Sequence, residues 1–568
     1  MTSSKRGADL LVQVLQEQGV ERVFALSGNH IIPLFDALFG SGIELIHTRH
    51  EAACVHMADA YARVTGKVGV ALVTGGPGHA NAVSALYTAL MSESPVLLLS
   101  GHAPHDQLGL GAFQEMRQAE MAAPVCKLSI TASSLEALRS EVLQCFQAAA
   151  SGRPGPVHLS LPTDVLEAVS GSKPFAHPNL LPEGEGMAAK LLSSPLPSGE
   201  GVGVGESFRA IITALQQALR PLIITGPATL TRAHRHTLIA LEAALGIPVI
   251  GTESPRGTGD PSLGAFAEML AQADCVLLLG KKLDFTLKFG RAPAFAANST
   301  VLQIDPDQTE LDRSKRAIGA RLTQAVLAET HASIAALATD AKRHLNAAWL
   351  SDVQRALTHR PQAWHAPRGN AGAALQGMLH PVEASRPLQA VLDRHPDAVL
   401  VCDGGEFGQW AQACLSAPHR VINGTAGAIG AGISLALGSR SAVAKNSSTA
   451  APIIAFMGDG TFGFHSSEFD TAVRHGLPFI AIVGNDARWN AEFQIQLKAY
   501  GKDRLIGCEL LPTRYDEVAR AFGGYGESVT EPAQLLPAVE RALQSGLPAC
   551  INVMIQGLSA PNVKLSDA

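Results

Sequence analysis

The sequence predicts an α/β protein with three doubly wound parallel-sheet domains, and three observations lead to this prediction. Short apolar runs that are typical of buried parallel strands recur along the chain and alternate with amphipathic helical segments. The chain has 568 residues, enough for about three or four domains of ordinary size. Of its residues, 46% are hydrophobic and only 17% are charged, so an ample core is available.

Composition and charge argue against several classes of protein. The formal net charge is −6 and no Lys/Arg run occurs, which argues against nucleic acid and anionic membranes as partners. No apolar run reaches the ~18 residues that a membrane span needs. The N-terminus leads into a helical pattern and not into an apolar signal region. The eight cysteines form no Cys-x-x-Cys pair, so we expect reduced cysteines in a cytoplasmic protein.

The first unit, residues 1–185, shows the alternation of strands and helices most clearly. Leucines and valines at helical spacing predict a helix over residues 8–18. The strands expected next are 23–26, 43–47, 68–73 and 96–99, with helices over 32–39 and 52–64. Gly/Ser/Pro-rich composition around 193–207 leaves little to bury, so residues 186–207 are predicted to form a flexible linker.

A second α/β unit follows over residues 208–345. Its expected strands are 221–224, 248–250, 276–279 and 301–304. No Gly-x-Gly-x-x-Gly motif opens it, so a structural domain without a ligand is favoured over a nucleotide-binding unit. Residues 346–380 carry His, Arg, Pro and Gly clusters and are predicted to be a poorly patterned connector.

The third unit covers residues 381–568. A helix over 385–395 leads into an apolar strand and then Asp403, Gly404 and Gly405. This order of helix, strand and glycines repeats the order seen over residues 8–28, so the first and last units are candidates for two copies of one module. Small residues then fill 424–432, and the chain ends with helices over 515–522 and 535–543 and a strand over 549–554.

Two apolar strands of this third unit end in polar turns. The strand over 453–457 ends in Gly458, Asp459, Gly460 and Thr461, and the strand over 479–483 ends in Gly484, Asn485 and Asp486. Parallel strands bring their carboxyl ends to one edge, where ligands bind. Two carboxylates beside a glycine turn suit Mg²⁺ that holds a diphosphate. A Gly-Asp-Gly alone is a common turn, so the paired spacing carries the prediction.

The spacing of these turns is similar to the metal–diphosphate motif of thiamine-diphosphate enzymes. The chain resembles the family that includes acetolactate synthase, pyruvate oxidase and benzaldehyde lyase, except over 193–207 and 346–380. Residues 48–53, 58–63 and 73–78 resemble the family's pyrimidine-binding domain, and the third unit resembles its diphosphate-binding domain. The strongest likeness is to benzaldehyde lyase, at 28–30, 49–53 and Trp489. Asp486 departs from the family, which has a second asparagine there.

The resemblance implies thiamine diphosphate and Mg²⁺ as cofactors and gives roles to individual residues. Glu51 would protonate the pyrimidine ring, and His30 and Gln114 would carry out proton transfers on the substrate. The cofactor would contact Glu51, Gly404, Gly405, Gly427, Ile429, Gly458, Asp459, Gly460, Thr461, Asp486 and Trp489. The metal would be held by Asp459, Asp486 and Arg488.

Plainer interpretations of these residues remain open at this point. Glu51 is alternatively a surface glutamate that pairs with Arg49 or His50, and His30 is alternatively a capping or core histidine. His50 and His102 are further candidates for proton shuttles. Trp489 and Phe493 are candidates for lining the substrate pocket, although core packing is an equal alternative.

The resemblance implies an enzyme that makes or breaks carbon–carbon bonds through a carbanion at C2 of the cofactor. The leading interpretation is a lyase or carboligase that acts on 2-hydroxy ketones and aldehydes. One alternative is a 2-keto acid decarboxylase or acetolactate synthase, and another is a non-catalytic, cofactor-binding regulatory protein. The family also implies a homodimer or homotetramer with the active site at the subunit interface.

Overall fold

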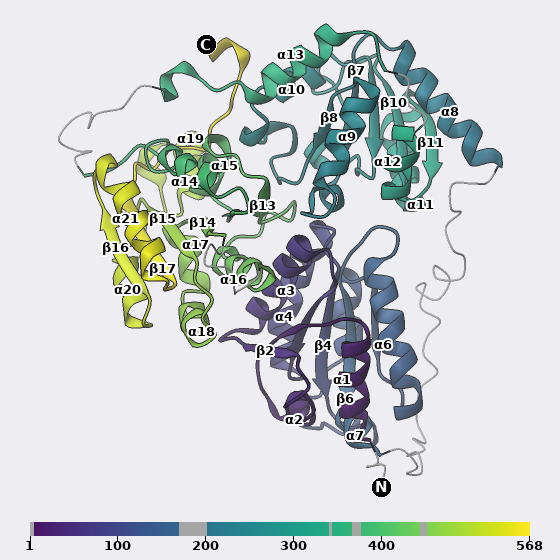
Figure 1. Ribbon diagram of the computed structural model, residues 1–568, viewed down its shortest axis with the longest axis vertical. Helices are drawn as coiled ribbons and strands as arrows, with labels where there is room; N and C mark the ends of the chain where they lie inside the picture. Colours follow the sequence, from purple (N-terminus) through teal and green to yellow (C-terminus); the bar gives the residue numbers. More distant parts are fainter. Residues whose placement is uncertain (1–4, 170–201, 340–342, 366–376, 444–450, 568) are drawn as a thin grey trace. The chain divides into compact units, whose positions relative to one another are not determined.

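The computed structural model of the chain describes residues 5–169, 202–339, 343–365, 377–443 and 451–567 (Figure 1). The chain divides into two compact units, residues 1–195 and 196–568. The first unit holds one parallel sheet and the second unit holds two. The prediction of three parallel-sheet domains is therefore confirmed, whereas their boundaries stay predictions.

The first unit has a six-stranded parallel sheet of order β2-β1-β3-β4-β6-β5. Its strands are β1 (Arg22–Ala25), β2 (Glu44–His47), β3 (Gly69–Val73), β4 (Val96–His102), β5 (Leu128–Thr131) and β6 (Val157–Pro162). Its helices are α1 (Gly7–Glu17), α2 (Ile32–Leu38), α3 (Glu51–Thr65), α4 (Pro77–Met91), α5 (Gln118–Ala122), α6 (Leu135–Ala150) and α7 (Thr163–Glu167). β3 and β4 are buried along their whole length, as is typical of central parallel strands.

The ends of α3 have local causes in the sequence. The Nδ1 atom of His50 accepts the backbone N–H of Ala52 at 3.1 Å and caps the first turn. Gly66 closes the helix with a φ of +75°, a conformation that suits glycine. Glu51 is therefore fixed as the first helical residue, near the N-terminal part of α4, where Asn81 donates a hydrogen bond to its carboxylate.

The central sheet, in the second unit, has five strands in the order β11-β10-β9-β7-β8. Its strands are β7 (Pro221–Thr225), β8 (Val249–Gly251), β9 (Cys275–Leu279), β10 (Thr300–Asp305) and β11 (Leu322–Leu327). The helices around it are α8 (Val202–Gln217), α9 (Arg235–Leu245), α10 (Phe266–Leu270), α11 (Gln308–Ile318), α12 (Thr330–Thr339) and α13 (Ala347–Thr358). Leu277 and Leu279 belong to one apolar cluster and Val276 and Leu278 to another, so both faces are covered.

The C-terminal sheet has six strands in the order β13-β12-β14-β15-β17-β16. Its strands are β12 (Val399–Cys402), β13 (His419–Ile422), β14 (Ile453–Gly458), β15 (Ile480–Asn485), β16 (Tyr525–Val529) and β17 (Ala549–Met554). Its helices are α14 (Gln389–Arg394), α15 (Glu406–Cys414), α16 (Gly432–Ala442), α17 (Asp459–Phe464), α18 (Glu468–Arg474), α19 (Asn490–Tyr500), α20 (Tyr515–Ala521) and α21 (Pro532–Ser545). The strand order repeats that of the first unit, which supports the prediction of two copies of one module.

Two connecting segments differ from the prediction. Residues 186–201 of the predicted linker lie outside the described residues. Residues 202–207, which were predicted to belong to the linker, are part of α8, and the later turns of this helix pack on the central core. The connector predicted over 346–380 contains α13, and its residues 366–376 lie outside the described part. Trp349, Val353 and Ala356 recur at helical spacing and are buried, which explains this helix. In the described residues, no helix is long and apolar enough to cross a membrane.

Candidate active site

Two carboxylates follow neighbouring strands of the C-terminal sheet. β14 and β15 pair in parallel up to Gly458 and Gly484, so their carboxyl ends lie at one edge. Asp459 is the first residue of α17, and Asp486 directly follows β15. The two polar turns that the sequence singled out therefore lie side by side.

Both carboxyl groups are in an environment that disfavours negative charge. Burial raises the pKa of Asp459 to about 6. Burial, and then the charge of Asp459, raises the pKa of Asp486 to about 7, and the Arg488 cation offsets this only in part. A divalent cation would relieve both the desolvation and the repulsion, so this pair has the chemistry of a magnesium site.

The protein offers few side-chain ligands for such a cation. Among the described residues, no group of three or more His, Cys, Asp or Glu side chains is placed to hold a metal ion. A cation between Asp459 and Asp486 would therefore take its remaining ligands from phosphate, main-chain and water oxygens. This mixture is the one that Mg²⁺ commonly adopts in phosphate-binding enzymes.

The neighbours of this pair have distinct tasks. The backbone N–H of Arg488 donates to Oδ2 of Asp459 at 3.2 Å, and its guanidinium lies 4.3 Å from the ring centre of Phe493. A guanidinium has no lone pair for a metal, so only the main-chain carbonyl of Arg488 is available as a ligand. The Asn485 amide donates to Thr513 O and Asn552 Oδ1 at 2.9 and 3.1 Å, which makes it structural.

All the residues of this unit that were predicted to hold the cofactor or the metal line one cavity of about 220 Å³. They come from four loops of the C-terminal sheet. They are Gly404, Gly405, Gly427, Ile429, Gly458, Asp459, Gly460, Thr461, Asp486, Arg488 and Trp489.

Two glycines in this cavity are required by close approaches, and a third is required by its backbone conformation. A Cβ atom on Gly460 would lie 2.5 Å from the Trp489 ring, and one on Gly404 would lie 2.6 Å from Ile429. Gly405 has a φ of +88°, which side chains rarely adopt. A glycine-walled cradle beside an acidic pair fits a group that carries a diphosphate and its metal.

Sequence reasoning missed Asp403, a buried carboxylate that organises the cavity wall. Its carboxylate accepts the N–H groups of Gly404, Gly430 and Gly432 at 2.7, 3.1 and 2.9 Å. Burial raises the pKa of Asp403 to about 6, and these N–H groups oppose that rise. The signal was present, because Asp403 follows a buried strand and precedes two glycines, as Asp459 follows β14.

The first unit gathers the remaining predicted residues around residues 74–78. Nδ2 of Asn81 donates to Oε2 of Glu51 at 3.0 Å. A Cβ on Gly78 would lie 3.4 Å from Oε1 of the same carboxylate, so the first turn of α4, directly after the β3–α4 loop, approaches Glu51 closely. Asn81 was also missed, because nothing in the sequence marks its contact with a residue thirty positions away.

His30 and Gln114 contact the same loop. Nδ1 of His30 lies 3.2 Å from Oγ1 of Thr74, and its ring stacks on Phe113 with centroids 6.0 Å apart. Burial lowers the pKa of His30, so the ring is neutral at pH 7. A Cβ on Gly76 would lie 2.8 Å from Gln114. Glu51, His30 and Gln114 are thus brought together on one unit.

The two weaker histidine candidates are tied to the backbone. His50 caps α3, as described above. His102 has Nδ1 3.1 Å from the Ala103 carbonyl oxygen and Nε2 2.9 Å from that of Met116. These contacts describe structural positions for both rings.

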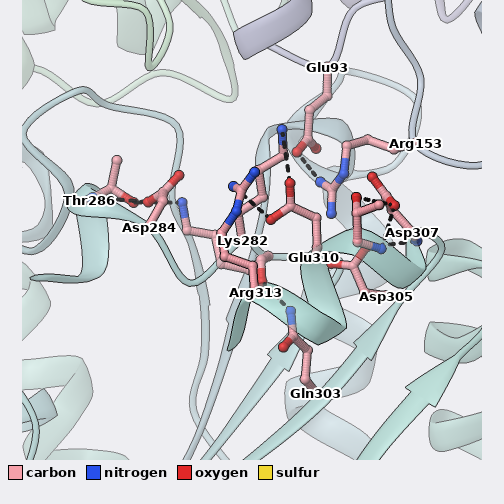
Figure 2. Close-up of polar contacts among 12 residues, drawn as sticks. Glu93, Arg153, Lys282, Asp284, Thr286, Gln303, Asp305, Asp307, Glu310 and Arg313 are labelled. Carbon is pink, nitrogen blue, oxygen red and sulfur yellow. Dashed lines mark hydrogen bonds and ion pairs between the residues drawn. The ribbon is translucent and has the colours of Figure 1, made fainter. Parts of the chain in front are cut away.

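At the carboxyl edge of the central sheet, polar and charged side chains contact one another (Figure 2). Glu310 is buried and lies 2.9 Å from Arg313 and 3.9 Å from Lys282. Nζ of Lys281 donates to Thr286 at 2.9 Å, and Thr286 donates to Asp284 at 2.5 Å. This arrangement agrees with a structural central domain, which stays a prediction.

Comparison with known families gives three matches along the chain. Residues 5–121 match the model described as "Thiamine pyrophosphate enzyme, N-terminal TPP binding domain". Residues 208–329 match the central domain of the same enzymes, and residues 403–553 match their C-terminal TPP binding domain. The matches contain Glu51, Asp459 and Asp486 in the two domains named for cofactor binding.

Known proteins similar to the chain are similar over nearly its whole length. A probable acetolactate synthase of Mycobacterium bovis is 33% identical over 96% of this chain and 95% of its own. Proteins named 2-hydroxyacyl-CoA lyase 2 are 31% identical in Caenorhabditis elegans and 30% in Homo sapiens. These cover 93% and 97% of this chain and 85% and 90% of their own lengths.

Proposed function

Because the chain belongs to the thiamine pyrophosphate enzyme family, we propose that it is a carbon–carbon lyase or carboligase that acts on 2-hydroxy ketones and aldehydes, or on acyl-CoA-like donors. The enzyme depends on thiamine diphosphate. One observation carries the proposal, namely that every residue predicted to hold the cofactor in the second unit lines a single cavity, and that these residues include a pair of neighbouring carboxyl groups.

The residues of the chain have the following proposed tasks. Asp459, Asp486 and the Arg488 carbonyl hold Mg²⁺, and the Gly458–Thr461 turn and Gly404–Gly405 hold the diphosphate. Ile429 and the Gly427 carbonyl orient the rings, and Trp489 closes the cradle against Gly460. When bound, thiamine diphosphate supplies a nucleophilic carbon and an electron sink beside the substrate carbonyl.

Glu51 and His30 are proposed to handle protons, and Gln114 is proposed to position the substrate. Glu51 shares a proton with the pyrimidine ring, and its contact with Asn81 fixes the carboxylate for this task. The neutral His30 ring can accept or donate a proton through one nitrogen while the other contacts Thr74. Gln114 orients the substrate carbonyl, supported by its place beside Gly76.

We propose a homodimer or homotetramer in which each active site takes Glu51 from one copy and Asp459 from another. Exposed large apolar side chains support an assembly. In the second unit they include Phe464, Ile495, Tyr500, Ile506 and Leu511, and in the first unit Tyr87, Leu110, Phe113 and Met121. A cytoplasmic location is also proposed, supported by eight free cysteines in the described residues.

A decarboxylase or acetolactate synthase is the second candidate, since one similar protein is named a probable acetolactate synthase. The test is a screen with thiamine diphosphate and Mg²⁺. Aldehyde released from 2-hydroxy ketones or 2-hydroxyacyl thioesters supports the lyase, and CO₂ released from pyruvate or benzoylformate supports the second candidate. A protein that binds the cofactor but turns over neither class would be the non-catalytic alternative.

A further inference from the structure

The loop that carries Gln114 has an unusual backbone. We call residues 107–118 the Gln114 loop. Gln114 has a φ of +57°, and Gly109 and Gly111 have φ values of +81° and +79°. A residue with a Cβ atom occupies this region only where its surroundings hold it there, and such residues concentrate at functional sites.

Glu115 is the side chain that holds the first half of the loop. Its Oε1 accepts the N–H of Gly109 at 2.5 Å, and its Oε2 accepts those of Gly111 and Ala112 at 3.1 Å each. A single carboxylate therefore binds three backbone donors of the turn that leads into Gln114. These N–H groups lower the pKa of Glu115, so the carboxylate is ionised at neutral pH and makes charge-assisted bonds.

The second half of the loop is anchored to the core. Nε2 of His102 lies 2.9 Å from the Met116 carbonyl oxygen. Gln118 is buried, accepts the N–H of Gly76 at 2.8 Å, and donates to Ser160 and the Gly101 carbonyl at 3.0 and 3.1 Å. Gln114 thus lies between a rigid anchor on its C-terminal side and the Glu115 bonds on its N-terminal side.

Apolar burial does not hold the first half of the loop. Leu110 is 78% exposed and Phe113 is 65% exposed. The fit of Gln114 against Gly76 is close, because a Cβ on Gly76 would lie 2.8 Å from it. A small shift of the loop would therefore move Gln114 and the Phe113 ring that stacks on His30.

We propose that Glu115 is a positioning residue that holds the Gln114 loop in the one conformation that presents Gln114 and Phe113 to the substrate. The proposal rests on the function proposed above for Gln114. In the described part of the chain, the Glu115 carboxylate hydrogen-bonds only to backbone N–H groups of its own loop, so its effect on catalysis passes through Gln114.

The test compares Glu115→Ala and Glu115→Gln with Glu120→Ala in the full-length protein. Glu120 is a matched control, since it lies in the same region and its carboxylate pairs with the exposed Arg117 at 2.8 Å. Amide hydrogen exchange of peptides covering 107–118 is measured without cofactor by mass spectrometry. The kcat, KM and thiamine diphosphate affinity are then measured with the best carbonyl substrate.

We expect exchange in the loop to rise about tenfold in Glu115→Ala, because three charge-assisted bonds are lost. Glu115→Gln keeps one acceptor oxygen and should be intermediate, and Glu120→Ala should match wild type. We expect kcat/KM to fall about tenfold in Glu115→Ala with cofactor affinity within about twofold. Gly111→Ala serves as a second variant, because its Cβ meets no atom within 4 Å but its positive φ strains the same turn.

Two results would overturn the proposal. One is unchanged loop exchange in Glu115→Ala, and the other is faster exchange with unchanged kcat/KM on a substrate that wild type converts. If wild type with cofactor converts no carbonyl substrate, the proposed function fails. The part of the positioning role that concerns the substrate then fails too. The exchange measurement still decides whether Glu115 holds the loop, so the two failures are distinguishable.

Discussion

Asp459 and Asp486 show that a candidate site residue can be recognised by an environment that disfavours its charged form. Each is a carboxyl group whose pKa is raised by burial, and Asp486 is raised further by its neighbour. Uncompensated charge of this kind destabilises a fold, so it persists where a ligand supplies the missing opposite charge. The pair is therefore the strongest single indication of a cation in the molecule.

Glu51 provides a test of the account at the scale of a single residue. Glu51→Gln keeps the shape of the side chain but removes its proton exchange, so we expect kcat to fall at least about 100-fold. Thermal stability should change little, since the side chain is only partly buried. Glu136→Gln, another glutamate in a first helical turn, is the control and should keep full activity. A Glu51→Gln enzyme with wild-type kcat would remove Glu51 from the mechanism.

The sequence and the resemblance predicted the residues that we propose to carry the site, but they missed those that contact and position them. The polar turns after β14 and β15 and the residues around Glu51 were visible because each ends a regular element. Asn81 acts through a contact between α4 and α3, and Glu115 acts through backbone contacts within its own loop. No regular pattern in the sequence reports contacts of either kind. Asp403 was the exception, since its pattern matched that of Asp459 and was passed over.

At the scale of elements, four of the five strands that sequence reasoning missed share one property. β5, β11, β13 and β16 each lie at the edge of a sheet. Edge strands are half-exposed, as the partly buried residues of β11 and β16 show, so they lack the continuous apolar run of β3 or β9. The other central strands were predictable for the opposite reason, but β6 was missed although it is an interior strand that is buried along its whole length.

Two glycines of helix α17 should respond in opposite ways to substitution by alanine. Gly460→Ala would place a Cβ 2.5 Å from the Trp489 ring, so we expect lower cofactor affinity and a changed tryptophan fluorescence. Gly463→Ala, in the same helix, meets no atom within 4 Å and should raise stability by about 0.5–1 kcal/mol. Thermal unfolding and fluorescence titration measure both. Equal behaviour of the two variants would contradict the packing described for the cradle.

Helix α20 offers a prediction about pH. Burial favours the neutral form of Asp516, but Arg514 and then Arg520, at 2.6 and 2.9 Å, outweigh it and lower the pKa. A lowered pKa stabilises the fold above the unfolded value of 3.8, and this stabilisation is lost as the pH falls through the folded value. Asp516→Asn should cost about 1–3 kcal/mol at pH 7.

The pH profile separates this mechanism from simple packing. The difference in unfolding temperature between wild type and Asp516→Asn should stay constant from pH 7 to about pH 4.5 and shrink only at lower pH. Asp470→Asn, in a more exposed pair with Arg474, is the control and should change stability little. A difference that does not depend on pH below 4 would assign the effect to packing.

At the scale of the whole molecule, two sheets of identical strand order carry the two groups of site residues. The first presents Glu51, His30 and Gln114, and the second presents the acidic pair and its glycine cradle. Repeated modules are often joined in symmetric assemblies, and exposed apolar side chains on both units favour one here. The division of these residues between the first and third sheets was predicted from the sequence. How copies of the chain pair cannot be derived from the structure of one chain.

Mixing two inactive variants tests the proposed assembly. Glu51→Gln and Asp459→Asn each remove one half of every site. If sites form between copies, half of randomly reassembled dimers are hybrids with one intact site of two, so activity should return to about a quarter of wild type. Co-purification of two differently tagged variants confirms exchange of the chains, and gel filtration with light scattering gives the size of the assembly. Full exchange without recovered activity would place both residues of a site on the same chain.

Calorimetric titration of thiamine diphosphate with Mg²⁺ into the purified protein is the most direct test of the central claim. Wild type should bind one cofactor per chain, and binding should require the metal. Asp459→Asn should lose at least about tenfold in affinity, while the exposed Glu492→Gln at the cavity rim should bind as wild type does. No heat of binding to wild type, or equal binding by Asp459→Asn, would contradict the account.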